Sequence, residues 1–396
     1  MAKKEQVPAI RFQGFADPWE QRKFSDFVLR ESVFQASSSE YPSVEYEDVV
    51  AEEGRLNKDI RQKETQKTGI VFDGTQVLYG KLRPYLHNWL NPDFTGVAVG
   101  DWWVLRPVGA DKKFLYRLIQ TQQFDEVANQ SSGSKMPRAD WNLVSNTEFI
   151  IPSSLDEQRQ IAGTFDDLDN LITLHQRKYD KLVAIKRSML EKMFPREGSR
   201  FPEIRFAGFT DPWEQRKLSE VFSSYTDPVD IPHDGYERLG IRSHAKGTFH
   251  NYVPAGHELQ TAQMHRVAAN KFIVNITFGW EHAVAVTDEN DAGKLVSHRF
   301  PQFSLSDELD PQFLKFIILD ERFRHHLWLA SPGGAGRNRV LNLNQMLQYE
   351  IQIPCVAEQR KIAGALINID ILITLHQRKL EKLQAIKRSM LEKMFV

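Results

Sequence analysis

The chain has 396 residues, and 51 Lys and Arg residues stand against 52 Asp and Glu residues, which gives a formal net charge of −1. This balance neither indicates nor excludes a polyanionic partner, so any basic surface must be local. The single cysteine, Cys355, excludes an intramolecular disulfide and a Cys-rich metal framework. The start MAKKEQVPAIRF lacks the apolar core of a signal peptide, and no apolar run approaches about 18 residues. We therefore expect a soluble, cytoplasmic protein of roughly two to three domains.

The first element along the chain occurs twice. Residues 10–28 read IRFQGFADPWEQRKFSDFV, and residues 204–222 read IRFAGFTDPWEQRKLSEVF. Asp17 and Asp211 each begin the sequence Asp-Pro-Trp-Glu, which we interpret as a helix N-cap beside a packed tryptophan rather than an acid–base pair. Residues 1–28 are therefore assigned to the first copy of a repeated scaffold, and residues 195–222 to a linker and the second copy. The duplication predicts a pseudo-two-fold protein.

Each scaffold element is followed by a segment of unlike sequence, residues 29–156 in the first half and 223–357 in the second. Alternating apolar residues between turn signals predict several strands. These strand patterns lie over residues 69–72, 77–79, 97–104, 271–278 and 283–287. We expect each segment to form a compact mixed α/β module.

The two modules also share a faint order of elements. Short helices are predicted to begin at Asp111 and Asp310. A Gly/Ser loop with basic residues follows, SSGSKMPRADWN in the first module and SPGGAGRNRVLNLN in the second. A β-like run then closes at Pro152 or Pro354.

Long helices are predicted over residues 157–194 and 358–396, and their first 38 residues are identical at 28 positions. Apolar residues step by four and three along each segment, which is a heptad seam. We expect the two seams to pack on each other as an antiparallel coiled coil, with different partners for each helix as the alternative. The predicted helix-pairing residues are Ile161, Phe165, Leu168, Ile172, Leu182, Met189, Ile362, Leu366, Ile369, Ile373, Leu383 and Met390. The expected fold class is thus α/β (α+β), with two modules joined by two long helices.

Four polar residues fall on these seams. His175 and His376 are interpreted as half-buried histidines that bond a neighbouring side chain, because no acidic or Cys partner stands at metal-ligand spacing. Lys186 and Lys387 either extend to solvent or mark where the seam frays. No metal site is predicted.

Sequence motifs of catalysis are missing from the chain. It holds no G-x-x-x-x-G-K-[ST], no H-E-x-x-H, no G-x-S-x-G and no paired Cys motif. We therefore predict no catalytic residues and no cofactor in this chain.

The order of variable module, long helix, variable module and long helix resembles the specificity subunit of type I restriction-modification systems. The likeness is carried by Ile-Pro…Glu-Gln-Arg-x-Ile-Ala at residues 151–162 and 353–363, by LITLHQRK and AIKRSMLEKMF in both helices, and by LYGKLRP at residues 78–84. The second module departs from Leu-Arg-Pro and reads FIVNITFGW at residues 272–280. The resemblance as a whole covers essentially the entire chain.

The resemblance implies a non-catalytic subunit with two target recognition domains, each reading one half of an asymmetric, interrupted DNA sequence. The helices would then act as spacer and as docking platform. Methylation subunits would use S-adenosylmethionine to methylate adenine, and restriction subunits would use ATP and Mg²⁺. A coiled-coil scaffold with two protein-binding modules and no nucleic-acid role is the alternative.

Basic and amide side chains on the module loops are the predicted DNA contacts. Arginine suits guanine O6 and N7, asparagine suits adenine N6 and N7, and lysine mostly meets phosphate. The predicted residues are Lys81, Arg83, Lys135, Arg138 and Asn142 in the first module, and Arg242, His244, Lys246, Arg337, Asn338 and Arg339 in the second. Arg138 and Arg339 fall at equivalent positions on the 201-residue offset, which favours them over the other residues.

Overall fold

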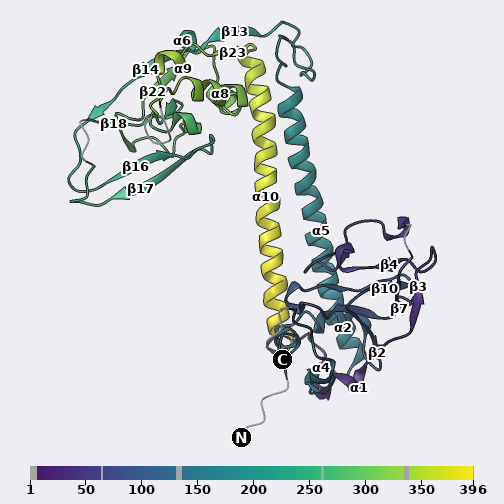
Figure 1. Ribbon diagram of the computed structural model, residues 1–396. Helices are drawn as coiled ribbons and strands as arrows, with labels where there is room; N and C mark the ends of the chain where they lie inside the picture. The colour runs from purple at the N-terminus through teal and green to yellow at the C-terminus, as the bar shows by residue number, and fades with distance from the viewer. Residues whose placement is uncertain (1–6, 64–65, 131–135, 260–262, 334–338, 396) are drawn as a thin grey trace. The chain divides into compact units, whose positions relative to one another are not determined.

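The computed structural model describes residues 7–63, 66–130, 136–259, 263–333 and 339–395. It divides into two compact units, residues 1–178 with 376–396 and residues 179–375, called unit 1 and unit 2 below. Each unit contains one mixed α/β module and a part of both long helices (Figure 1). The module boundaries given above, 29–156 and 223–357, stay predictions.

The module of unit 1 is built from short strands, four short α-helices and three 3₁₀ helices that precede the first long helix in the described part of the chain. Its elements are β1 (Glu20–Lys23), α1 (Phe24–Phe27), β2 (Val28–Glu31), β3 (Phe34–Ala36), β4 (Ser43–Val44), η1 (Tyr46–Asp48), β5 (Val49–Val50), β6 (Arg55–Leu56), η2 (Ile60–Gln62), β7 (Thr68–Phe72), β8 (Val77–Gly80), η3 (Pro84–Leu86), β9 (Trp89–Leu90), β10 (Gly96–Ala98), β11 (Trp102–Pro107), α2 (Lys112–Leu118), α3 (Gln122–Ala128), α4 (Trp141–Asn146) and β12 (Glu148–Ile151). The long helix α5 (Leu155–Lys192) follows.

The module of unit 2 repeats much of this order. Its elements are β13 (Glu214–Lys217), α6 (Leu218–Val221), β14 (Phe222–Tyr225), β15 (Pro228–Val229), β16 (Tyr236–Ile241), β17 (Thr248–Val253), β18 (Met264–Arg266), β19 (Phe272–Val274), η4 (Gly279–Glu281), β20 (Val284–Val286), β21 (Leu295–Ser297), β22 (Gln302–Leu305), α7 (Pro311–Ile317), α8 (Glu321–Leu329), α9 (Leu343–Met346) and β23 (Glu350–Ile353). The second long helix is α10 (Val356–Met394).

Both modules share one sheet plan. The order β2-β11-β8-β9 in unit 1 matches β14-β22-β19-β20 in unit 2, and the antiparallel ribbon β1-β12 matches β13-β23. The second sheet differs, since it has the order β3-β7-β10-β4 in one module and β15-β18-β21-β16-β17 in the other. The predicted strands at 69–72 and 77–79 are confirmed as β7 and β8. The single strand predicted over 97–104 is wrong, because Gly100 turns at φ 100° and separates β10 from β11.

The repeated Asp-Pro-Trp-Glu sequence leads into a strand, not a helix. Trp19 and Trp213 are fully buried, as expected for packed tryptophans. The N-cap interpretation of Asp17 and Asp211 is wrong, because the residues after each tryptophan form β1 or β13. The strands form because they pair with the distant β12 and β23, an interaction that a local sequence pattern does not contain.

A buried ion pair locks each scaffold element onto its long helix. The Arg11 guanidinium donates to both carboxylate oxygens of Glu157, at 2.7 and 2.8 Å. In unit 2 the Arg205 guanidinium donates to both oxygens of Glu358, at 2.7 Å each. Both glutamates are buried, so the first residue of the Glu-Gln-Arg motif holds the scaffold.

The glutamine of the same motif joins the helix to its module. In unit 1 the Gln158 side-chain oxygen accepts from the Asp111 backbone N–H at 2.8 Å, and its amide donates to the Pro152 carbonyl at 2.8 Å. In unit 2 Gln359 makes the same two bonds with Asp310 and Pro354. These contacts give the Glu-Gln-Arg sequence a structural role in both copies.

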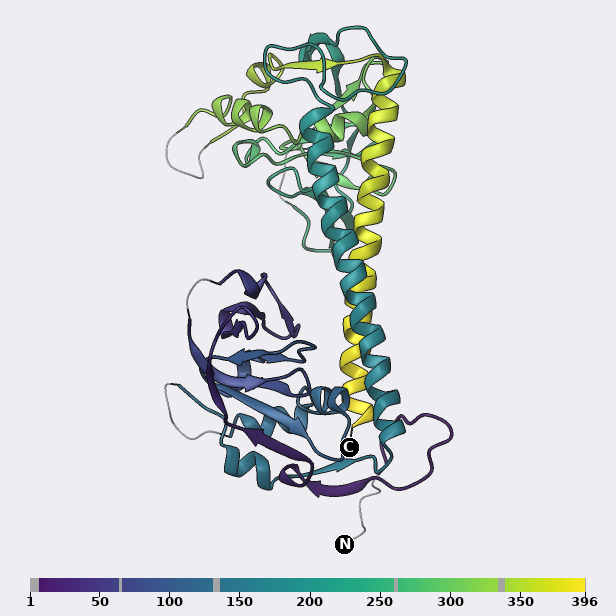
Figure 2. The ribbon, with the colours of Figure 1, turned by 90° about the vertical axis from the view of Figure 1, so that its right-hand side faces the viewer.

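Within each unit, α5 and α10 lie side by side and run antiparallel (Figure 2). In unit 1, Lys387 Nζ lies 2.7 Å from Asp169 Oδ1. In unit 2, Lys186 Nζ lies 2.6 Å from Asp370 Oδ1. The two seam lysines therefore form ion pairs across the helices. All twelve predicted helix-pairing residues are buried or half-buried in α5 and α10.

Each long helix also ends in a module core. In unit 1 the Phe395 ring stacks on Phe114 with centroids 5.4 Å apart. In unit 2 Phe194, just beyond α5, stacks on Phe313 at 5.6 Å. Equivalent aromatic pairs thus close both cores. No helix in the described ranges is both long and apolar enough to cross a membrane.

The two seam histidines bond each other. In unit 1 the Nδ1 atoms of His175 and His376 are 2.8 Å apart, so one ring donates a proton and the other accepts it. This confirms the interpretation of a histidine satisfied by a neighbouring side chain. Burial lowers the pKa of His175, and the charges of His376, Lys379 and Lys178 lower it further.

This histidine pair predicts a dependence of stability on pH. A folded-state pKa below the unfolded value means that the unfolded chain takes up the proton first as the pH falls. The contribution of His175 is therefore fully present above about pH 6.5, and it decreases as the pH falls below that value and through the lower pKa of the folded state. We expect the midpoint of thermal unfolding to fall more between pH 7.5 and 5.5 in the wild type than in His175→Gln, as followed by circular dichroism. Equal decreases in the two proteins would contradict this expectation.

Candidate nucleic-acid interface

Three of the predicted basic residues of the first module come together in the structure. The Arg83 backbone N–H donates to the Pro137 carbonyl at 2.7 Å, and the Ala139 N–H donates to the Lys81 carbonyl at 2.8 Å. Leu82 forms an isolated β-bridge with Arg138 between these two bonds. The segment after β8 is therefore paired with the end of the Gly/Ser loop, which brings Lys81, Arg83 and Arg138 to one place.

Asp101 organises two of these cations. Its carboxylate accepts from Arg138 Nη2 at 3.1 Å and lies 3.4 Å from Lys81 Nζ. Burial acts to raise the pKa of Asp101, but the hydrogen bond from Arg138 and the charge of Lys81 outweigh burial and lower the pKa. Asp101 therefore remains a carboxylate that holds both cations. Sequence reasoning missed this residue.

Arg83 has a strained backbone. Its φ of 50° lies in the left-handed region although Pro84 follows, a combination that a residue before proline adopts rarely. Such strain of about 1–3 kcal/mol persists only where the surrounding structure imposes it, and it concentrates at functional sites. The Arg83 side chain forms no hydrogen bond or ion pair with any residue in the described part of the chain. It is available to a ligand.

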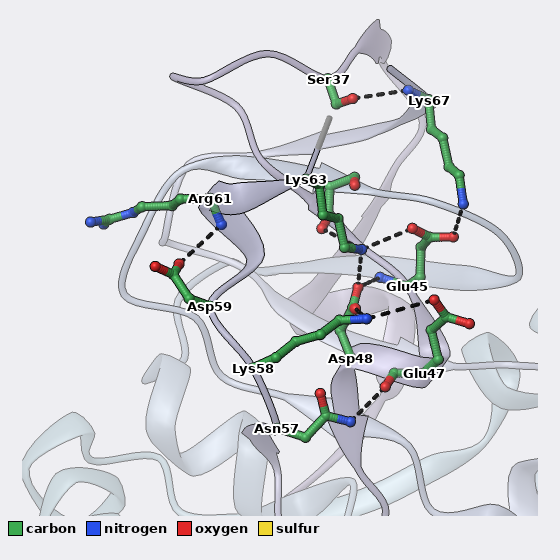
Figure 3. Close-up of polar contacts among 11 residues, drawn as sticks. Ser37, Glu45, Glu47, Asp48, Asn57, Lys58, Asp59, Arg61, Lys63 and Lys67 are labelled. Carbon is green, nitrogen blue, oxygen red and sulfur yellow. Dashed lines mark hydrogen bonds and ion pairs between the residues drawn. The ribbon is translucent and has the colours of Figure 1, made fainter. Parts of the chain in front are cut away.

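A network of lysines and acids forms around Glu45 and Asp48 in the same module (Figure 3). Lys63 Nζ donates to Glu45 Oε1 at 2.8 Å and also bonds the fully buried Asp48, which Lys58 contacts at 3.0 Å. Tyr46 lies between these two acids in sequence, and its hydroxyl accepts from the Leu82 N–H at 3.0 Å. The same hydroxyl donates to the Asp101 carbonyl. The Tyr46 hydroxyl therefore joins the segments that hold Leu82 and Asp101 beside the basic cluster.

Two amide residues begin equivalent helices. Asn142 is exposed in the first turn of α4, which is capped by the Asp140 side chain. Asn344 is exposed in the first turn of α9, which is capped by the Asn342 side chain. Sequence reasoning named Asn142 and missed Asn344. Lys135, also predicted in this loop, lies outside the described residues.

The first predicted cluster of the second module lies on one hairpin. Arg242, His244 and Lys246 are exposed between β16 and β17. Backbone bonds from His244 to Glu281, at 2.9 Å, and from Ala245 to His282, at 2.8 Å, fix this loop. The structure thus brings these three residues together, but the Arg242 side chain is already bonded to the Thr248 carbonyl.

The predicted equivalence of Arg138 and Arg339 is wrong. The Leu341 N–H donates to the Ile276 carbonyl at 2.9 Å, as Ala139 does to Lys81. Ala139 therefore corresponds to Leu341, and Arg138 corresponds to Val340 instead. The reason is a one-residue shorter link between β23 and α10 than between β12 and α5. Arg339 instead lies over the Trp328 ring, 4.9 Å from its centroid. Arg337 and Asn338 lie outside the described residues.

A cavity of about 580 Å³ opens in the second module. Its wall includes two arginines and an asparagine that sequence reasoning missed, Arg238, Arg299 and Asn275. Neither arginine side chain forms a hydrogen bond or ion pair with any residue that the structure describes. Exposed Phe278 also lines the wall. Unpaired guanidinium groups beside an amide and an aromatic ring can bind the edges of nucleobases or a phosphate.

Comparisons with a family model and with a known protein point to the same family. Residues 45–184 and 210–385 match the model of the type I restriction modification DNA specificity domain. The chain is similar to the type I restriction enzyme MjaVIII specificity subunit of Methanocaldococcus jannaschii, with 23% identity over 299 residues that cover 71% of this chain and 68% of that protein.

The fold is also similar to a solved structure. The type I restriction-modification system S subunit from M. genitalium aligns with a TM-score of 0.59, covering 98% of this chain and 99% of that one. The sequences are 11% identical, so this likeness concerns the fold alone.

Proposed function

Because the chain belongs to the type I restriction-modification DNA specificity family, whose role is DNA recognition, we propose that its two modules read the two halves of one asymmetric, interrupted sequence. The observation that carries this proposal is the contrast between the modules. They share a sheet plan and a paired loop, yet Lys81 and Arg138 correspond to Ile276 and Val340. Identical modules on a two-fold frame would read a palindrome, whereas these modules read unlike half-sites.

The proposed contacts divide between bases and phosphates. In the first module Arg83, Arg138 and Asn142 suit base edges, while Lys81 suits phosphate. In the second module the hairpin cations and the cavity arginines take these roles. The local grouping of cations agrees with a chain whose overall charge is −1.

The long helices serve as spacer and docking platform in this proposal. At about 1.5 Å per residue, the 38 residues of α5 span about 57 Å, so helix length sets the number of unread base pairs. Apolar residues outside the seam remain exposed in both helices. They include Leu171, Leu174, Ile185, Leu372, Leu375 and Ile386. We propose that they bind methylation subunits, which carry S-adenosylmethionine and assemble with ATP-dependent restriction subunits.

The function is tested by co-expressing the chain with its methylation subunit in cells and mapping methylated adenines across the genome by single-molecule sequencing. We expect methylation confined to one interrupted, asymmetric motif. A stable complex with an active methylation subunit and no motif would instead favour a scaffold with two protein-binding modules.

Docking has its own prediction. Leu171→Asp with Leu174→Asp places two charges in an interface that buries leucine, so we expect the affinity for the methylation subunit to fall at least about tenfold. The matched control is Thr173→Asp, because Thr173 is exposed and points away from both leucines, by about 160° from Leu171 and about 100° from Leu174. Affinity is measured by titration calorimetry. Equal losses in both variants would locate the docking surface elsewhere.

A further inference from the structure

Equivalent positions in the two modules hold side chains of opposite charge. The Lys81 N–H donates to the Asp101 carbonyl at 2.9 Å, and the Ile276 N–H donates to the Arg299 carbonyl at 3.0 Å. Both bonds join the segment after the central strand, β8 or β19, to the residues just before β11 or β22. Asp101 and Arg299 therefore occupy the same place in the shared frame.

The residues that neighbour this position also differ between the two modules. In the first module Asp101 is surrounded by Lys81 and Arg138 and binds both. In the second module the corresponding neighbours are Ile276 and Val340, and Val340 is exposed. An acid that binds two cations in the first module thus corresponds to an arginine in the second, and the positions of the two cations correspond to apolar residues.

The Arg299 side chain has no partner among the described residues. It is exposed at the wall of the 580 Å³ cavity, where Arg238 and Asn275 also lie. The acid on this wall, Glu281, already accepts from the Ser243 hydroxyl at 2.6 Å. The five donors of Arg299 therefore remain for a ligand with closely spaced acceptors.

On the basis of the proposed function, we infer that Arg299 reads a guanine in the half-site of the second module, and that Asp101 positions Lys81 and Arg138 in the first. Guanine presents O6 and N7 as adjacent acceptors in the major groove, and the guanidinium fork binds them together. Ile276 and Val340 offer no competing acceptor to Arg299. In the first module the cations contact DNA, and Asp101 acts through them.

Phosphate is the other source of acceptors, and the substitutions separate the two. Arg299→Ala removes the fork and the charge, whereas Arg299→Lys keeps the charge and loses the fork. With base reading, both variants relax one G·C position of one half-site to other base pairs, with discrimination falling about ten- to hundredfold. With a phosphate contact, Arg299→Ala weakens binding to all sequences alike and reduces the salt slope by about one, while Arg299→Lys changes little.

The experiment uses the full chain with its methylation subunit. Methylated adenines are mapped for wild type, Arg299→Ala, Arg299→Lys and Asp101→Asn, and binding to duplexes with each base pair replaced is measured over a salt series. We expect Arg299 variants to relax one half-site and Asp101→Asn to relax the other. The matched control is Arg322→Ala in the same module, because Arg322 is engaged by Asp320. This control is expected to leave both half-sites unchanged.

Three outcomes would overturn the inference. These are a uniform loss across sequences, an unchanged motif in both Arg299 variants, and relaxation of the same half-site by the Arg299 and Asp101 variants. Thermal unfolding of each variant checks its folding, and Arg299→Lys still decides the question if Arg299→Ala is unstable. Absence of any interrupted motif in the wild type would instead reject the proposed function, so the two failures are distinguishable.

Discussion

Replacing residues 223–357 with a second copy of residues 29–156 is expected to convert the recognised sequence into an interrupted inverted repeat. The junctions fall at equivalent residues, since Val28 and Phe222 each begin the strand that follows a short helix, and Glu157 and Glu358 each bind the arginine of the preceding scaffold element. With identical modules on the pseudo-two-fold frame that the duplication predicts, we expect both half-sites to become the one read by the first module. Methylation at the original asymmetric motif should fall at least about a hundredfold, because several base contacts are lost at about 1–3 kcal/mol each.

The hybrid is expected to fold, because the end of the long helix that the transplanted module contacts carries the same aromatic residue in both units. Phe114 stacks on Phe395 in unit 1, and Phe313 stacks on Phe194 in unit 2. A transplanted Phe114 therefore encounters phenylalanine again. The reciprocal hybrid, with residues 223–357 in both places, is the control and should methylate the other inverted repeat. Persistence of the original motif in a folded, active hybrid would contradict the assignment of one half-site to each module.

The long helices were predictable because their signal is local and repeated. The heptad spacing of α5 and α10 is in the sequence itself, and the structure begins each helix two residues before the predicted start. The histidine bond and the lysine ion pairs lie on the same seam, so only their partners had to be found. His175 and His376 are 201 residues apart, the offset that aligns the helices.

The recognition residues were only partly predictable, because the two modules differ in loop lengths. Lys81 and Ile276 are 195 residues apart, Asp101 and Arg299 are 198 apart, and Ala139 and Leu341 are 202 apart. No single offset aligns these pairs. Their equivalence is defined by backbone hydrogen bonds between distant segments, which is why Arg339 was wrongly aligned with Arg138.

The residue types in the loops predicted where the basic clusters lie, but they did not identify every side chain that we propose to contact DNA. Lys81, Arg83 and Arg138 were predicted as basic residues near motifs, and the structure places them together. Arg299 carried no such signal, because it follows a strand in a stretch without a motif. Arg299 was identified only because it occupies the position that Asp101 occupies in the other module. A comparison of the modules in three dimensions therefore adds what residue type alone does not contain.

The Glu358→Gln substitution is expected to lower the free energy of unfolding of unit 2 by about 3–5 kcal/mol. The substitution leaves the Arg205 guanidinium largely buried and without its carboxylate, and loss of one partner from a buried ion pair costs about this much. Double replacement of Glu358 and Arg205 with methionine should restore most of the stability, because no unpaired charge remains.

The matched control for this experiment is Glu308→Gln. Glu308 pairs with Arg216 at 3.5 Å on the surface of the same unit, and a pair this exposed contributes at most about 1 kcal/mol. Stability is measured by urea unfolding, and hydrogen exchange read by mass spectrometry assigns the loss to unit 2. We expect faster amide exchange in residues 204–222, because Arg205 ties this scaffold segment to α10. A loss no larger than that of the control would mean that the Glu-Gln-Arg motif does not hold the scaffold through its glutamate.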